Sequence, residues 1–369
     1  MKIERVEAIP VNIPIYPERL SFGAIEVINY VITRVYTDES VVGLGEAATL
    51  QGPTWSEESQ ESIKYVIDRY LSKAVLGEDP FCLERVLERM DRIVRGNLFA
   101  KAAIEFALYD IIGKTLGVPI YQLLGGLYRG RIPLSWTLAT CDPELDAAEA
   151  QEKVKQGWRI LKIKAGVGDP ERDVAKVKRV REAVGDEVKV RVDANQGWDF
   201  REALRIMGKL EQYDVEFVEQ PLPKWDLDGM ARLASTFKTP IMADESVCTV
   251  QDALNIIKKG AASIFSLKMT KSGGISNSKK VAAIAEAAGI GCYVGCMIET
   301  GIGTAAYAHF AGSTRNVGYG CELFGPLRLE EDITGGSIEY IDGEIVVPKG
   351  PGLGVEIDDE KLEKYKVEF

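Results

Sequence analysis

Short apolar segments alternate with amphipathic helical stretches from about residue 134 onward. The apolar segments have the length of buried strands, and the stretches between them carry apolar residues at the spacing of helices that pack on one face. Eight strands separated by helices in one continuous run predict a (β/α)8-type barrel rather than an open sheet. The predicted strands begin near residues 134, 160, 188, 215, 240, 263, 291 and 318.

The segments on either side of this run have different patterns. The first fifty residues alternate apolar and polar positions around a turn-like Asp-Glu-Ser at 38–40, which predicts an antiparallel hairpin or meander. From residue 57 the pattern is helical, until Gly117 and Pro119 end it. After residue 330 come short pieces punctuated by Gly and Pro, which we expect to return to the N-terminal domain. We therefore expect an N-terminal α+β domain at 1–125, a barrel at 126–325 and a C-terminal segment at 326–369.

The composition is that of an ordinary soluble globular protein. The chain has 369 residues, enough for one large barrel or two domains. Its net charge of −11 argues against a nucleic-acid surface, which needs clustered Lys and Arg on one face. Because no long apolar run and no apolar signal segment occurs, we expect a cytoplasmic protein without a membrane partner. The six cysteines form no Cys-x-x-Cys pair, which favours reduced, buried thiols.

The chain has a single histidine, His309, in an alanine-rich helical stretch. One histidine excludes a metal site built from several histidines, and an ordinary helix position argues against a Ser-His-Asp triad. General-base work must then come from Lys, Asp or Glu.

Polar residues stand at the carboxyl ends of the predicted strands, where barrel enzymes have their active sites. Three of the spacings between them are 26, 25 and 24 residues, which is about one barrel unit each, so the side chains can converge on one centre. The residues are Lys162, Lys164, Asp193, Glu219, Asp244, Lys268, Glu299 and Glu322.

Asp193, Glu219 and Asp244 would bring three carboxylates from successive strands to one point. Three anions that close either take up protons or surround a cation. Oxygen ligands without His or Cys suit Mg²⁺, with Mn²⁺ as the alternative, and leave positions for water and substrate. The sequence therefore predicts a metal site.

The lysines lie on both sides of this predicted metal site. Lys164 comes from the strand before the three carboxylates and Lys268 from the strand after them, so the two would approach the centre from opposite sides. Lys162 points the same way as Lys164 because strand residues two apart share a face. A neighbouring ammonium and partial burial are expected to lower a lysine pKa toward the range useful for proton transfer.

This constellation resembles the enolase superfamily and, within it, the muconate lactonizing enzymes. The resemblance covers nearly the whole chain and implies a modified TIM-type (β/α)7β barrel with an N-terminal α+β capping domain that the C-terminal segment completes. It also implies a homo-oligomer, either a dimer or an octamer. The motifs that carry it are "NLFAKAAIEFALYDIIGK", "WTLATCD", "VDANQGW", "EQPLPKWDLDGMARL", "PIMADES" and "GCELFGPL".

The resemblance further implies a chemistry and a role for each residue. A small carboxylate substrate would bind the metal, and Lys164 or Lys268 would move a proton at the carbon alpha to the carboxylate. The metal and the other lysine would stabilise an ene-diolate. Lys162 would tune Lys164, and Asn195 would assist the metal site. Glu322, Glu299, Arg19 and Thr137 are expected either to contact the substrate or to support the residues that do.

Several features bear on the substrate. Dipeptide epimerases of this subgroup carry Asp-x-Asp at the eighth strand, where this chain has Glu322-Leu323-Phe324, and this favours a lactonizing enzyme. The segment "IYPERLSFG" offers only Arg19 as a basic residue, however, and "MIETGIGTAA" resembles succinylbenzoate synthases or racemases. A muconate-type cycloisomerase is therefore the prediction. A dipeptide epimerase, an N-succinylamino acid racemase and an o-succinylbenzoate synthase stay open.

Other classes of protein account for fewer of the polar residues at the strand ends. Residues 301–306 match the dinucleotide form G-x-G-x-x-A, and residues 270–278 could bind a phosphate at a helix N-terminus. Both fit ordinary loops of a barrel, and neither explains the lysines and carboxylates. A non-catalytic barrel would not need a complete polar centre. The mandelate-racemase branch uses a histidine at the seventh strand, and His309 lies about ten residues beyond that strand.

Overall fold

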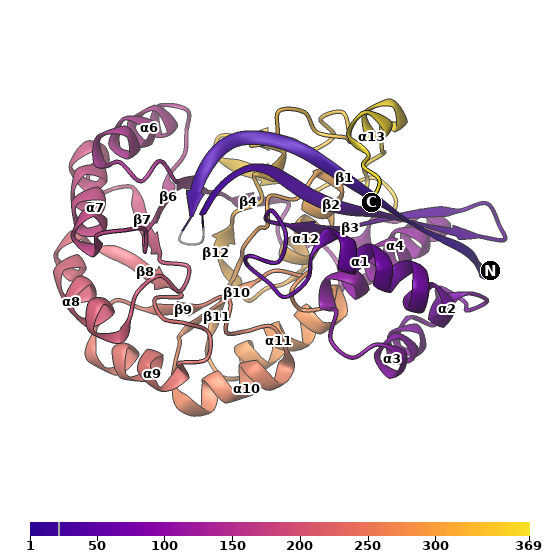
Figure 1. Cartoon of the computed structure of the whole chain (residues 1–369), viewed down its shortest axis with the longest axis horizontal. Helices are drawn as coiled ribbons and strands as arrows, with labels where there is room; N and C mark the ends of the chain where they lie inside the picture. Colours follow the sequence, from indigo (N-terminus) through magenta and orange to yellow (C-terminus); the bar gives the residue numbers. More distant parts are fainter. Residues whose placement is uncertain (21–22) are drawn as a thin grey trace.

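An eight-stranded parallel sheet forms the centre of the computed structural model, which describes residues 1–20 and 23–369 (Figure 1). The strand order is β12-β11-β10-β9-β8-β7-β6-β5, and a parallel bridge between Leu134 and Cys321 closes the sheet into a barrel. The predicted barrel is confirmed. Its strands are β5 (Ser135–Leu138), β6 (Ile160–Lys164), β7 (Lys189–Asp193), β8 (Val215–Glu219), β9 (Ile241–Ala243), β10 (Ile264–Leu267), β11 (Gly291–Val294) and β12 (Val317–Cys321).

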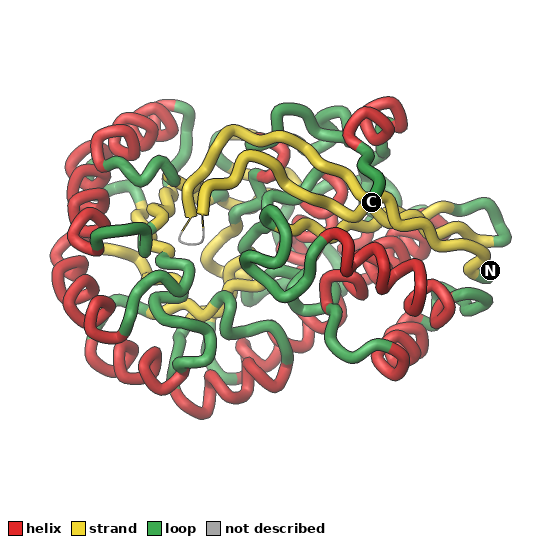
Figure 2. Tube along the Cα trace, viewed as in Figure 1, coloured by secondary structure: helices red, strands yellow, loops and turns green. Residues whose placement is uncertain are grey.

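Helices lie between consecutive barrel strands and surround the barrel (Figure 2). Side-chain caps fix where several begin, as Asp142 does by accepting the N–H of Glu144 at the start of α6. In the described part of the chain a short 3-10 turn, Gly325–Leu327, follows β12 in place of an eighth helix. The expected (β/α)7β arrangement is thus confirmed. The helices are α6 (Pro143–Lys155), α7 (Pro170–Val184), α8 (Phe200–Leu210), α9 (Leu227–Thr236), α10 (Val250–Lys259), α11 (Ile275–Ala287) and α12 (Gly301–Ser313).

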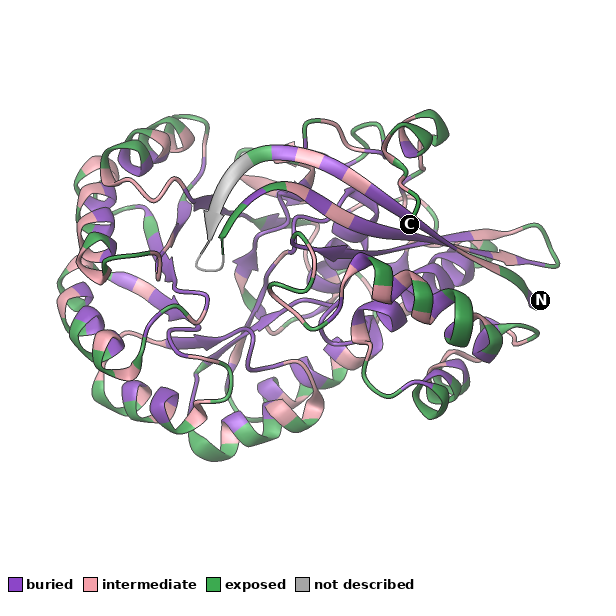
Figure 3. Ribbon diagram, viewed as in Figure 1, coloured by how far each residue is buried: buried purple, intermediate pink, exposed green. Residues whose placement is uncertain are grey.

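The N-terminal domain is an antiparallel sheet of order β1-β2-β3 packed on helices, as the sequence predicts. Helix α4 lies directly on β3, since a Cβ at Gly45 would come within 1.8 Å of the Ala103 carbonyl oxygen. Exposed positions gather on the outer helices, whereas the barrel strands are buried (Figure 3). The elements are β1 (Ile3–Leu20), β2 (Gly23–Thr37), β3 (Val42–Thr49), α1 (Gln60–Val66), a π-helical turn (Ile67–Leu71), α2 (Ser72–Val75), α3 (Leu83–Ile93), α4 (Leu98–Leu116) and α5 (Ile120–Leu123).

The hairpin of β1 and β2 arches from this domain toward the barrel (Figure 1). Ile15 forms an antiparallel bridge with Leu329, and the Tyr16 N–H donates to the Arg328 carbonyl oxygen at 3.2 Å. The far part of the hairpin therefore lies beside the chain that leaves β12.

The C-terminal segment returns by two routes. Strand β13 (Tyr340–Ile341) pairs with β14 (Glu344–Val346), and β14 pairs with β4 (Arg131–Pro133), so these pieces join the barrel side of the domain junction. Helix α13 (Asp359–Tyr365) then leads back to β1, where Lys366 bridges Val11. In the described residues no helix is both long and apolar enough to cross a bilayer.

Glu46 of β3 caps the N-terminus of barrel helix α12. It accepts hydrogen bonds from the N–H groups of Thr300 and Gly303, each at 3.0 Å, and from the Thr300 hydroxyl. Asp332 accepts the N–H of Gly301 at 3.0 Å. Because two carboxylates already occupy this helix N-terminus, the dinucleotide alternative for residues 301–306 has no place for a pyrophosphate.

Glu105 of α4 has the same role at α11. One of its oxygens accepts the Ser276 N–H at 3.2 Å, and a Cβ on Gly274 would lie 1.6 Å from the other. The loop at 270–278 is therefore filled by a carboxylate of the N-terminal domain, and the phosphate alternative is excluded for the same reason. Both contacts fix the N-terminal domain to the barrel.

His309 lies in α12, away from the barrel mouth. Its ring is buried, packs on Tyr121 with 5.6 Å between ring centroids, and has Nε2 at 3.0 Å from the Leu353 carbonyl oxygen. Burial lowers the pKa of His309 to about 4, since the hydrogen bond to Leu353 offsets only part of the cost of charging the ring. The ordinary helix position expected from the sequence is confirmed.

Replacing Glu46 with alanine should destabilise the protein by about 2–4 kcal/mol, because two buried N–H groups and a hydroxyl lose their acceptor. Urea unfolding measures this loss. Glu39→Ala is the matched control, since that carboxylate is exposed and forms an ion pair with the N-terminal ammonium. Equal stability of the two variants would contradict the docking role of Glu46.

The imidazole of His309 should stay neutral from pH 8 down to about 5, because its pKa is about 4 in the folded chain and near 6.5 unfolded. Its contribution to stability is present above pH 6.5 and is lost as the pH falls through about 4, up to about 3 kcal/mol. Proton NMR follows the single imidazole directly. His309→Gln should show a shallower acid transition, and a ring that titrates near pH 6.5 would refute this.

Candidate active site

A pocket opens at the carboxyl ends of the barrel strands, and both domains line it. Lysines and polar side chains of the barrel form one part, and apolar side chains from the capping domain and from the segments after β11 and β12 form the rest. The lining residues are Leu50, Trp55, Thr137, Lys162, Lys164, Asn195, Lys268, Cys296, Met297, Ile298, Glu322 and Phe324.

Lys162 is the most deeply buried lysine of this pocket. Its Nζ lies 2.8 Å from Glu219 Oε2, 2.7 Å from Glu322 Oε2 and 3.2 Å from Asp193 Oδ2. These carboxylates come from β8, the end of β12 and β7, so three separate barrel strands hold one ammonium group.

Lys164 lies closer to the pocket opening, with 12% of its side chain exposed. Its Nζ donates to Asp193 Oδ2 at 2.7 Å and to Asn195 Oδ1 at 2.8 Å. The Asn195 side chain donates in turn to Glu245 at 3.1 Å. Asn195 therefore joins the lysine to the carboxylates on the next strands.

Lys268 approaches from β10, four strands away from β6 in the eight-stranded ring. Its Nζ donates to Asp244 Oδ2 at 2.7 Å and lies 4.2 Å from the Trp55 ring centroid. Lys271 donates to the other oxygen of Asp244, also at 2.7 Å. Burial alone would raise the pKa of Asp244, but the two ammonium groups outweigh it and hold that pKa below its ordinary value.

The described residues of the site include a cluster in which five carboxylates face four lysines. The carboxylates are Asp193, Glu219, Asp244, Glu245 and Glu322, and the lysines are Lys162, Lys164, Lys268 and Lys271. Burial, together with the nearby carboxylates, raises the pKa of Glu219 to about 8 despite Lys162, and its Oε1 has no hydrogen-bond partner among the described residues. A buried, incompletely compensated carboxylate with an unpaired oxygen, beside two others, suits a divalent cation with oxygen ligands. Asp193, Glu219 and Asp244 each place at least one oxygen against a lysine ammonium group. In the described residues no group of three metal-ligating side chains is arranged around one point.

The pKa values of Lys162 and Lys268 move opposite to the expectation from sequence. Burial lowers the pKa of Lys162, but Glu219, Glu322 and Asp193 raise it more, so it lies well above the ordinary value. The pKa of Lys268 is raised for the same reason, chiefly by Asp244. The contacting carboxylates outweigh both burial and the neighbouring ammonium group.

The other residues predicted to act at the site do not all lie in the pocket. Thr137 donates to Glu322 at 2.8 Å, so both lie in the pocket. Glu299 is buried behind the pocket, where its Oε1 accepts the Met297 N–H at 2.9 Å, and it does not belong to the lining. The side chain of Arg19 lies outside the described residues.

The sequence reasoning missed several residues of the site. Lys271 follows Lys268 by one helical turn, a spacing that could have indicated it. Glu245 directly follows Asp244. Leu50 and Trp55 come from the capping domain, and no spacing relates them to the barrel strands.

Comparisons with known proteins agree with this geometry. Residues 3–125 match the family model "Mandelate racemase / muconate lactonizing enzyme, N-terminal domain", and residues 146–361 match "Enolase C-terminal domain-like". The chain is 41% identical to chloromuconate cycloisomerase CbnB of Cupriavidus necator, over 99% of both chains. It is 40% identical to muconate cycloisomerase 1 of Pseudomonas putida, over 98% of both.

Solved structures give the same result. The muconate lactonizing enzyme of Pseudomonas fluorescens, complexed with muconolactone, superposes with a TM-score of 0.97 at 42% identity over 99% of both chains. The L-Ala-D/L-Glu epimerase of Bacillus subtilis superposes with a TM-score of 0.92 at 39% identity, over 96% of this chain and 99% of that one. The chain therefore belongs to the mandelate racemase and muconate lactonizing enzyme family of the enolase superfamily.

Proposed function

We propose that this protein is a muconate-type cycloisomerase that uses a divalent cation, with Mg²⁺ as the ion. In the reaction, one carboxylate oxygen of a conjugated dicarboxylate adds to a carbon of the adjoining diene and forms a lactone. The carbon alpha to the other carboxylate takes up a proton. Substrate and product are isomers, so no co-reactant is needed.

One observation carries the proposal. Lys164 on β6 and Lys268 directly after β10 reach one pocket from opposite sides of the barrel, and a buried carboxylate cluster lies between them. With a proton donor on each face of a flat substrate, the alpha carbon can be protonated from either side. Each ammonium also has a carboxylate acceptor that would hold it in place.

Asp193, Glu219 and Asp244 would hold the cation. When bound, the cation would stabilise negative charge that develops on the substrate carboxylate. The unpaired oxygen of buried Glu219 supports this assignment. Lys162 would neutralise Glu219 and Glu322, and Asn195 would orient Lys164 through its side-chain oxygen.

The wall at Phe324 favours a lactonizing enzyme over an epimerase. An ammonium substrate needs paired carboxylates, but Leu323 is buried and Phe324 stacks on Trp136 with 5.3 Å between ring centroids. Of this segment only Glu322 offers a carboxylate to the pocket, and Lys162 and Thr137 already engage it. An apolar wall suits the carbon skeleton of a diene.

Lys164→Ala and Lys268→Ala should each lower kcat for lactone formation from cis,cis-muconate by about a thousandfold or more, because a general acid or its partner is lost. An absorbance assay follows loss of the diene. Lys189→Ala is the matched control, since Lys189 begins β7 at the other end of the barrel and pairs with Glu216. Full activity in both test variants would refute the assignment.

The substrate is tested with a panel of dicarboxylates, dipeptides and N-succinyl amino acids. Lactone formation is assayed first, and exchange of the alpha proton is then followed by NMR in D₂O. Lactonization of muconate with no exchange in dipeptides supports a cycloisomerase. If dipeptides are epimerised and no lactone forms from muconate, the protein is a dipeptide epimerase instead.

Removal of divalent ions with a chelator should abolish activity, and Mg²⁺ should restore it. Asp244→Asn should weaken Mg²⁺ binding by about tenfold or more, as measured by titration calorimetry without substrate, because a charged ligand is lost. Asp252→Asn is the control, since Asp252 caps α10 outside the pocket. Unchanged Mg²⁺ affinity in Asp244→Asn would contradict the predicted metal site.

A further inference from the structure

Ile298 holds a backbone conformation that β-branched residues rarely adopt. Its φ is +58°, in the left-handed region where Cβ comes too close to its own backbone. Such a residue keeps this conformation only where its surroundings enforce it, and these positions cluster at functional sites. Ile298 lines the pocket on the segment that leaves β11.

Two contacts enforce this conformation. The hydroxyl of Tyr30 on β2 donates to the Ile298 carbonyl oxygen at 2.6 Å. On another side Gly325 packs so closely that an added Cβ would lie 2.9 Å from the Ile298 carbonyl carbon. The backbone of Ile298 is therefore held by residues from the capping domain and from the end of the barrel.

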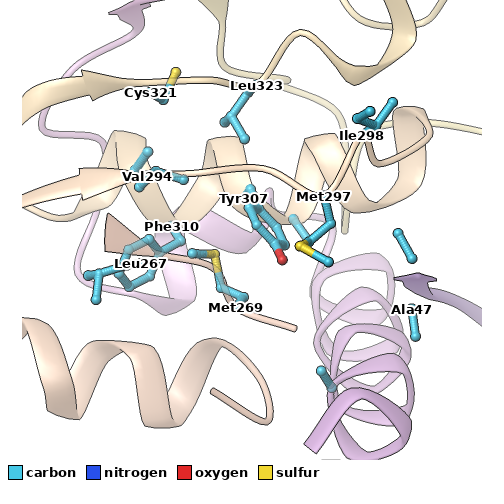
Figure 4. Close-up of a cluster of buried hydrophobic side chains, with 14 of the residues drawn as sticks. Ala47, Leu267, Met269, Val294, Met297, Ile298, Tyr307, Phe310, Cys321 and Leu323 are labelled. Carbon is cyan, nitrogen blue, oxygen red and sulfur yellow. The ribbon is translucent and has the colours of Figure 1, made fainter. Parts of the chain in front are cut away.

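The surroundings of Tyr30 favour its hydrogen bond to Ile298. Tyr30 is fully buried, and burial raises its pKa well above the ordinary value, so the hydroxyl keeps the proton that it donates. Figure 4 shows Met297 and Ile298 in one apolar cluster with Ala47 of β3, the strand that pairs with β2. This side of the pocket is thus anchored to the capping domain by a hydrogen bond and by apolar packing.

We propose that Tyr30 is a positioning residue that fixes the Ile298 side chain as a wall of the pocket, and that Ile298 held in this way limits which substituents the substrate can carry. The direction of a Cα–Cβ bond depends on φ, so release of Ile298 to an extended conformation would turn its side chain. The inference rests on the proposed function, since it concerns the substrate of the same site.

The first test is Tyr30→Phe, which removes only the hydroxyl. KM for cis,cis-muconate should rise about threefold or more with little change in kcat, and the ratio of kcat/KM between muconate and 3-chloromuconate should change by about as much. Tyr109→Phe is the matched control. Tyr109 also forms a buried hydrogen bond between the domains, to Ser276 at 3.1 Å, but it does not line the pocket.

The second test repeats Tyr30→Phe in the Ile298→Gly background. Glycine adopts positive φ freely and has no side chain to position, so Tyr30→Phe should no longer change the substrate ratio there. In urea unfolding, Tyr30→Phe should cost less stability with Ile298 present than in the Ile298→Gly background. With Ile298 present, loss of the hydrogen bond lets the strained backbone relax, and this offsets part of the cost. Glycine has no such strain to release.

The inference is overturned if Tyr30→Phe keeps the parent KM and substrate ratio, or if the effects of the two substitutions simply add. Failure of the proposed function gives a different result, in which the unsubstituted protein turns over neither muconate nor 3-chloromuconate. In that case the urea cycle decides by itself whether Tyr30 holds the strained Ile298.

Discussion

The balance of buried charge at the barrel mouth governs both the site and the stability of the fold. Lys162, Lys268 and Lys271 are almost completely buried, and each is held by a carboxylate within 2.8 Å. Buried ions persist only where partners and further hydrogen bonds compensate for the water they lose. Loss of one partner leaves a bare charge, so the strands must stay in register for the site and the fold to survive together.

Strand register brings these charges side by side. Lys164 pairs with Asp193, and Asp193 with Glu219, across three neighbouring strands. Helix α7 then fixes the end of β6, because Lys176 donates to the Lys164 carbonyl oxygen at 2.5 Å. The barrel thus supplies rigid placement, which a proton-transfer site needs more than it needs mobility.

The capping domain completes the site at the carboxyl ends of the barrel strands. It contributes Leu50 and Trp55 to the pocket, and it is attached through Glu46, Glu105 and Tyr30, whose side chains all bond to barrel loops or helix ends. Exclusion of water by these apolar side chains strengthens the electrostatic interactions beneath them. The same contacts that dock the domain therefore also shape the pocket.

Periodicity and spacing are local properties of the chain, and they were enough to predict the barrel and the order of its strands. They also predicted which strands carry Lys162, Lys164, Asp193, Glu219, Asp244 and Lys268. How these side chains meet depends on contacts between segments that are distant along the chain. In the folded chain Glu299 lies behind the pocket, carboxylate contacts raise the pKa of Lys162 and Lys268, and Glu46 and Glu105 cap the N-termini of two barrel helices. Tyr30 and Ile298 are 268 residues apart, and no local pattern relates them, since their contact exists only once both domains have folded together.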